Sequence, residues 1–387
     1  NKAWVNSNHT LENGSSVSFN TQLSSSVNRN YPKIVGQTEG VIAILANSAD
    51  KPVNITGTAN GDGKLPVVRV TNQGNEYYRI VDMGSEVAAN YSIASYGENA
   101  LIAIRDVNLD LDHVAEGMQV AKGGKITVDN DFIKITADHS DALQHHALNA
   151  QDGGEINIRS KSVELTVSGK STENNDPYTV FSSGIHTTYG GSIKVHADNI
   201  LSITVDTVNT ANDYAQNYGV YALGQYDKAG IIDLSGKDFN LNVSGSTRGS
   251  IGLVSAPYGQ NASLSAKFEN ISITASGDGI CGTTLNALAN TFASGINVQA
   301  DKLTIDAQNG IVATTRWGEN TITTHAKVLS VNSVDSAITN WSDLTQNNTA
   351  STNIKVAGND ITLFSEGYGV LSDVRNSDRN TSLIDVQ

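Results

Sequence analysis

Carboxylates and histidines able to do chemistry occur along the chain, but without the spacing of a known catalytic or metal site. Asp129 and Asp131 can both offer oxygen ligands to calcium, although aspartates beside a corner of the chain are more often only solvated. His145 and His146 are adjacent and point to opposite sides of a strand, which is poor geometry for one metal ion, so we expect both on the surface. We predict no catalytic residue, no metal site, no cofactor and no enzymatic activity.

Aromatic side chains next to carboxylates and amides give a stronger signal. They gather in two polar insertions, residues 173–181 and 212–218, where Tyr178 and Tyr214 stand at similar places. A tyrosine ring offers a large planar contact at a small loss of conformational entropy, and it stacks on sugar rings or anchors a protein partner. The alternative is that the insertions fold back and bury their own rings. The predicted ligand-binding residues are Asp176, Tyr178, Phe181, Tyr189, Asp213, Tyr214, Tyr218, Tyr221, Tyr226 and Tyr258.

Charged residues of both signs recur beside the same predicted corner. We align them as one column made of Asp131, Lys161, Asp198, Lys237, Lys267, Asp301, Lys327 and Asn359. Such a stripe can pair side by side with a second copy of the chain, and the residues predicted for self-association are Lys161, Lys237, Lys267 and Lys327. The alternative is a solvated ridge that binds nothing.

The composition favours strands over helices. Of 387 residues, 39% are hydrophobic and 17% charged, with 35 Gly, 5 Pro and 2 Met, and Asn, Ser, Thr, Val and Ile are frequent. The formal net charge of −14 works against binding to nucleic acid or to an acidic membrane surface. The single cysteine, Cys281, cannot form a disulfide within the chain and is expected to be a small buried apolar residue.

A repeat organises most of the chain. An alternating apolar stretch at Ile126 recurs as far as Ile354, 228 residues later in seven steps, or roughly 33 residues per repeat. A second alternating stretch, as at Ile133, follows each copy of the first, and a third carries a glycine before its apolar residue, as in Gly184-Ile185. Alternation with a period of two indicates strands with one buried face and one wet face.

The connections between these strands decide the fold class. They are too short and too polar for crossover helices, and the two-residue hairpin turns of a propeller blade are rare. We therefore predict an all-β, right-handed parallel β-helix with three strands per coil, in which like residues stack on like. A dozen coils at about 4.8 Å each make a rod of about 55 Å. We expect residues 1–90 to form a cap and irregular first coils, and residues 91–387 to form regular coils truncated at the C-terminal end.

The coil pattern resembles a known family. Gly123-Gly124, Gly153-Gly154 and Gly190-Gly191 precede the first strand of their coils, and the third strand begins with Gly-Ile or Gly-Val. From about Tyr91 onward this resembles the passenger domains of bacterial autotransporters, particularly adhesins. The resemblance implies a signal peptide upstream, an outer-membrane β-barrel downstream and a place on the cell surface or outside the cell.

The function we expect is adhesion. The resemblance and the tyrosines together predict an extracellular passenger that binds host glycans or extracellular-matrix proteins, or a copy of itself on another cell, by many modest contacts along a rigid rod. The alternative is a polysaccharide lyase or hydrolase on the same scaffold, although the Gly-His-Gly and Arg-Ile-Lys strings of galacturonase-like hydrolases are missing from the sequence. An inert stalk that only presents another part of a protein is a third possibility.

Overall fold

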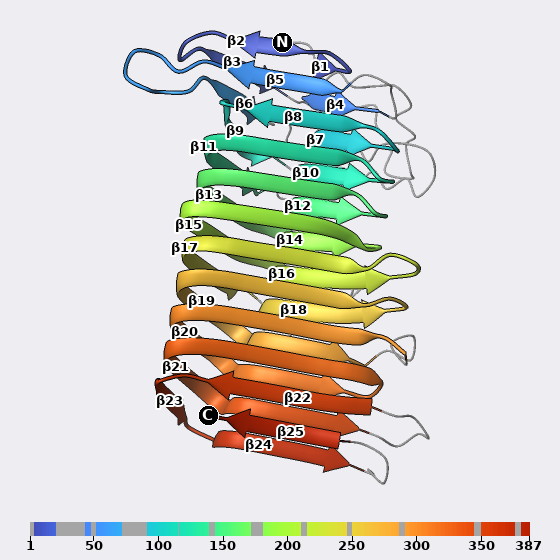
Figure 1. Ribbon diagram of the computed structural model, residues 1–387, viewed down its shortest axis with the longest axis vertical. Coiled ribbons are helices and arrows are strands. Elements are labelled where there is room, and N and C mark those ends of the chain that lie inside the picture. Colours follow the sequence, from blue (N-terminus) through green and yellow to red (C-terminus); the bar gives the residue numbers. More distant parts are fainter. Residues whose placement is uncertain are drawn as a thin grey trace.

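A computed structural model describes most of the chain as stacked β-strands (Figure 1). The described residues are 4–20, 43–47, 52–71, 91–114, 116–138, 144–171, 181–209, 215–245, 250–285, 291–343, 350–375 and 381–387. Every element within these ranges is a β-strand, and the paired strands run parallel. The fold is the predicted right-handed parallel β-helix, whose coils stack along the long axis of the molecule.

Each coil contributes one strand to each of three sheets, which we call the first, second and third sheet in chain order. The first sheet begins with β2 (His9–Leu11), β5 (Val53–Gly57) and β8 (Leu101–Arg105). The second sheet begins with β3 (Ser16–Asn20), β6 (Val67–Thr71) and β9 (Asn108–Val114). The third sheet begins with β1 (Trp4–Val5), β4 (Ile44–Ala46), β7 (Tyr91–Tyr96) and β10 (Glu116–Ala121).

In the middle of the molecule, single long strands bend from the first sheet into the second. These strands are β11 (Lys125–Ala137), β13 (Glu155–Ser171), β15 (Gly191–Asn209) and β17 (Gly230–Ser244). The third-sheet strands that alternate with them are β12 (Gln144–Gln151), β14 (Phe181–Thr188), β16 (Gln216–Gln225) and β18 (Ser250–Tyr258). Toward the C-terminus, β19 (Ala262–Thr284), β20 (Ala293–Thr315) and β21 (Gly318–Asp343) each pass through all three sheets. The last strands are β22 (Ala350–Ala357), β23 (Asp360–Ser365), β24 (Tyr368–Arg375) and β25 (Thr381–Val386).

The apolar columns predicted from the repeat are confirmed in register. Ile126 pairs with Ile156, and the same column continues through Ile193, Ile232, Leu264, Ile296 and Ile322 to Ile354. The second-sheet column from Ile133 to Ile361 is equally continuous. Most of these side chains are fully buried, so the interior is one unbroken apolar core along the axis.

The coils before residue 91 continue the same columns. Ile44 of β4 stacks on Ile93 of β7, and Val53 of β5 stacks on Ile102 of β8. A large part of the cap predicted within residues 1–90 falls in the ranges 21–42 and 72–90, outside the described residues.

The first corner, between the first and second sheets, holds a buried polar side chain in three consecutive coils, namely Asn108, Asn130 and Ser160. The Asn108 side-chain oxygen accepts hydrogen bonds from the backbone N–H groups of Asp131 (3.0 Å) and Phe132 (2.9 Å). One coil further on, the Ser160 hydroxyl donates to the Asn130 side-chain oxygen at 2.7 Å. These bonds satisfy backbone and side-chain groups where the chain bends and the ladder is interrupted.

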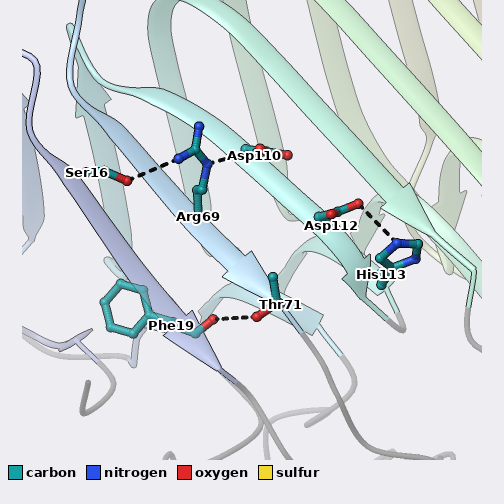
Figure 2. Close-up of polar contacts among 7 residues, drawn as sticks. All are labelled: Ser16, Phe19, Arg69, Thr71, Asp110, Asp112 and His113. Atoms are coloured by element: carbon teal, nitrogen blue, oxygen red, sulfur yellow. Dashed lines mark hydrogen bonds and ion pairs between the residues drawn. The ribbon is translucent and has the colours of Figure 1, made fainter.

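On the outer face of the second sheet, polar side chains of neighbouring coils bind to one another. Figure 2 shows Arg69 of β6 between Ser16 of β3 (3.3 Å) and Asp110 of β9 (3.3 Å), so one guanidinium links three coils. In the same region the His113 imidazole lies 2.5 Å from Asp138, and this hydrogen bond raises the pKa of His113.

Candidate binding surface

The corner that leads from the third sheet into the first is a tight turn with the same backbone in successive coils. Its two central residues have positive φ angles in three turns, namely Lys122-Gly123 (48° and 80°), Asp152-Gly153 (46° and 74°) and Tyr189-Gly190 (56° and 73°). In the first two turns, the N–H of the glycine that follows donates across the turn at 3.0 Å. Two left-handed residues in sequence make a type I′ turn, which prefers glycine, asparagine and aspartate. The bulky ring of Tyr189 therefore sits on a backbone that disfavours it.

Tyr189 and Tyr226 stack on each other at this corner. Their ring centroids are 5.5 Å apart, and the ring planes differ by only 7°. Tyr226 also has a positive φ, 58°, and the residue is 62% exposed. The N–H of Tyr226 donates to the carbonyl of Tyr258 at 3.2 Å, which brings a third predicted tyrosine beside the pair. We call Tyr189, Tyr226 and Tyr258 the tyrosine ridge.

Gln225 fixes the backbone of the ridge. Its side-chain oxygen accepts a hydrogen bond from the N–H of Tyr189 at 3.2 Å. Its own N–H donates to the carbonyl of Lys228 at 3.0 Å, which closes the turn that carries Tyr226. The connection between β16 and β17 projects sideways from the stack of coils in Figure 1. These hydrogen bonds of Gln225 thus fix the ridge on a corner that protrudes from the rod.

A groove lies on the outer face of the first sheet, which begins directly after this corner. Its floor is the column Ala103, Thr127 and Asn157, which pair in register on β8, β11 and β13. The next outward column, two residues further along each strand, carries the longer side chains Arg105, Asp129, Arg159 and His196. Short side chains beside long ones leave an open channel, and the space has a volume of about 570 Å³.

The groove is positively charged although the chain is acidic. Three cationic side chains, Arg105, Arg159 and Lys194, line it together with one carboxylate, Asp129, a formal charge of +2 with His196 neutral, against −14 for the chain. Within the described part of the chain, Arg105 and Lys194 have no ion-pair partner.

Asp198, at the rim, takes up part of the charge of its neighbours. It lies 3.5 Å from the Arg159 guanidinium and 3.0 Å from His196 Nε2. The other imidazole nitrogen, His196 Nδ1, lies 2.8 Å from the Ser235 hydroxyl. The imidazole is therefore held in place, while Arg159, with a side chain 65% exposed, stays accessible from solvent.

Three other predicted residues, Phe181, Tyr218 and Tyr221, lie on a different surface, the outer side of the third sheet. Phe181 is 5.1 Å from Tyr218 and 5.8 Å from Tyr221, measured between ring centroids. All three are half-buried; Phe181 packs against the imidazoles of His146 and His186, and Tyr221 stacks on His186. The predicted tyrosine patch is thus divided between two faces of the molecule.

The histidines of this cluster are buried. His146 is 2% exposed and its Nδ1 lies 2.5 Å from the Ser183 hydroxyl, so its predicted surface position is wrong. Burial lowers the pKa of His186 to about 4, since an imidazolium there loses its hydration. Burial likewise raises the pKa of Tyr221 to about 12. Cys281 is buried, as predicted.

The four lysines predicted for self-association do not share one column. The ammonium of Lys161 lies 2.8 Å from Asp131, and that of Lys327 lies 2.8 Å from Asp301, so both pair with the coil before them. Lys267 pairs in register with Ser235 and belongs to the outward column of Arg159 and His196. Its assignment to the corner column was wrong, because Phe268 occupies the corner position that a small residue holds in the neighbouring coils.

Some predicted site residues fall outside the described ranges, namely Asp176, Tyr178, Asp213 and Tyr214. Conversely, the groove residues Arg105, Arg159 and Lys194 were not predicted. Their signal was present in the sequence, because each directly follows a buried isoleucine of its first-sheet strand. The sequence alignment covered the inward residues and the charged residues at the corner, so it missed the charged residues on the outer face of the first-sheet strands.

Comparison with known proteins adds no assignment. No protein-family model matches the chain, and no curated protein sequence or solved structure matches it significantly. Within the described ranges, no group of three or more histidine, cysteine, aspartate or glutamate residues is placed to hold a metal ion. In the same ranges no helix is long and apolar enough to cross a membrane. Support for a function therefore comes from the tyrosine ridge and the groove.

Proposed function

We propose that this protein is a bacterial cell-surface adhesin, an autotransporter-type passenger that binds glycans or extracellular-matrix proteins through the tyrosine ridge. The observation that carries the proposal is the stack of the exposed Tyr226 on the half-buried Tyr189, each on a left-handed backbone. Strained residues persist where the surrounding structure imposes them, and they gather at binding sites. A solvent-exposed ring gains little stability from burial, so contact with a ligand is the better reason for its presence.

The rod supplies the mechanism. Parallel rings fixed by the β16–β17 turn offer a preorganised flat surface, which lowers the entropy lost on binding. One such contact is weak, and firm attachment of a cell then comes from many copies of the protein acting together. The partners we propose are host surface glycans or matrix proteins, or a second copy on another cell, with the protein held at the cell surface.

Binding of the purified protein to a glycan array and to immobilised fibronectin tests the proposal. Tyr226→Asn removes the ring and keeps a residue that accepts a positive φ. The matched control is Tyr368→Asn, because Tyr368 is 60% exposed but lies in β24, far along the rod. We expect Tyr226→Asn to weaken binding about tenfold or more and the control to leave it unchanged.

Two results would contradict the proposal. Equal binding by wild type and Tyr226→Asn removes the ridge from the site. Turnover of uronate polymers, with or without calcium, favours the lyase or hydrolase alternative over adhesion.

A further inference from the structure

The positive groove and the tyrosine ridge share one surface. Tyr189 precedes β15, and Lys194 and His196 lie within its first-sheet part. Lys194 lies five positions after Tyr189 with a tight turn between them, so the two are at most about 16 Å apart along the chain. An oligosaccharide of a few sugar rings is long enough to contact both the stacked tyrosines and the groove.

The sign and size of the charge define what the groove can hold. The lining carries +2, which Asp198 at the rim reduces to +1, and Arg105 and Lys194 lack an ion-pair partner in the described ranges, so the groove favours an anionic group. The chain as a whole carries −14, so a densely charged polyanion is repelled over most of its length. One carboxylate or sulfate on an otherwise neutral ligand gains the local attraction without that repulsion.

We infer that the groove binds the single acidic group, a carboxylate or a sulfate ester, of a largely neutral glycan whose sugar rings stack on the tyrosine ridge. This inference rests on the proposed glycan binding and specifies its ligand class. Arg159 and Lys194 are placed to hold the acidic group by charge-assisted hydrogen bonds, since they line the same space on adjacent strands. Asp129 lies between Arg105 and Arg159 in the outward column and limits the excess of positive charge, which selects against a second close acidic group.

The test uses an array of oligosaccharide pairs, each pair differing by one sialic acid, one uronic acid or one sulfate ester, together with a heparin octasaccharide. The groove variant is Arg159→Ala/Lys194→Ala. Its control, Lys302→Ala/Lys355→Ala, removes the same charge from exposed positions that do not line the groove. Circular dichroism and thermal unfolding establish that both variants are folded.

We expect wild type to bind the acidic member of some pairs about tenfold more tightly than the neutral member, a preference that weakens at high salt. The groove variant loses that preference, whereas the control keeps it. Tyr226→Asn weakens binding to both members of a pair alike. Comparison of the sialic acid, uronic acid and sulfate arms then identifies the anion.

Three outcomes overturn the inference. If the groove variant keeps the preference while Tyr226→Asn loses binding, the adhesin stands and the groove is not its acidic subsite. If only the heparin octasaccharide binds, the ligand is a dense polyanion. If wild type binds no saccharide at all, both the inference and glycan adhesion fail, and fibronectin binding remains the separate measure of the proposed function.

Discussion

Tyr189 and Tyr226 hold backbone conformations that a tyrosine side chain disfavours by about 1–2 kcal/mol each. The equivalent turn positions in neighbouring coils are Lys122 and Asp152, also with positive φ. The turn geometry therefore belongs to the coil and does not need an aromatic ring. A ring that the fold does not need, in a conformation that destabilises it, is best explained by what it contacts.

Loss of the Tyr226 ring should therefore not destabilise the protein. In Tyr226→Asn the free energy of unfolding should stay unchanged or rise by up to about 1 kcal/mol, because asparagine accepts the left-handed region more readily. Urea unfolding followed by circular dichroism measures it. Phe239→Ala is the contrasting variant, since that ring is fully buried and its loss should cost about 3–5 kcal/mol. A comparable fall in Tyr226→Asn would show that the ring is structural.

His186 makes stability depend on pH. The residue is 2% exposed and its folded pKa is about 4, against an ordinary 6.5. Below pH 6.5 the His186 imidazole binds a proton in the unfolded chain, whereas in the folded protein it stays neutral until about pH 4. The stabilisation is thus fully present above pH 6.5 and is lost as pH falls toward 4, by up to about 3 kcal/mol.

Replacement of the imidazole tests this origin. Asn149 occupies the same column one coil earlier, so His186→Asn is compatible with the site. The difference in unfolding free energy between pH 7 and pH 4.5 should shrink in this variant by about 2–3 kcal/mol. His196→Asn, a half-exposed histidine on the first sheet, serves as the control. An unaltered pH dependence in His186→Asn would assign the acid sensitivity to other groups.

At the scale of elements, the sharp bend into the third sheet selects small residues. Five glycines directly precede the buried apolar residue of a third-sheet strand, namely Gly184, Gly219, Gly252, Gly279 and Gly310. A Cβ atom on any of them would lie 2.4–2.9 Å from a second-sheet side chain. Second-sheet side chains therefore pack directly against these glycines, and the bend leaves no room for a larger residue there.

Two glycines of β20 separate this packing effect from a general effect of glycine. At Gly310 a Cβ would lie 2.4 Å from the Val331 side chain and 2.4 Å from the Ala337 carbonyl oxygen, whereas at Gly295 it meets no atom within 4 Å. We expect Gly310→Val to lower the free energy of unfolding by more than about 2 kcal/mol and Gly295→Val to leave it within about 0.5 kcal/mol. Urea unfolding of both variants measures the contrast. Similar effects of the two changes would contradict the packing argument.

The elements also show what could be predicted from the sequence. The columns from Ile126 and Ile133 were predictable, because parallel coils force like residues to stack and the period of two marks the buried face. The corner residues were not predictable, because a corner residue need only fit the corner residues of the coils on either side of it. Phe268 illustrates this, since its ring stacks on Phe239 at 5.1 Å and lies over Gly236, whose missing side chain makes room for it. The groove was missed for the same reason, as outward residues face solvent and need not repeat.

At the scale of the whole molecule, the coil at the C-terminal end differs from all described coils above it. Phe364, Tyr368, Val370, Leu383 and Val386 are between 41% and 60% exposed there. Their strands β23, β24 and β25 pair with a described strand on one side only. This coil thus combines an apolar surface with strand edges able to form further hydrogen bonds, which either a further coil of the rod or a second copy of the chain can cover.

The exposed last coil is a surface through which two copies of the chain can associate. Because a solenoid gains stability from each added coil interface, residues 1–387 prepared alone should meet end to end and bury apolar columns that are otherwise wet at this end. Sedimentation velocity over a range of protein concentrations should show association of the wild type that Phe364→Asp/Val370→Asp abolishes. Leu285→Asp/Val334→Asp adds the same charge at hydrophobic positions 41% and 45% exposed and should leave association intact. If both double variants dissociate alike, the added charge is responsible and not the loss of the apolar end; if the wild type stays monomeric throughout, the end does not associate.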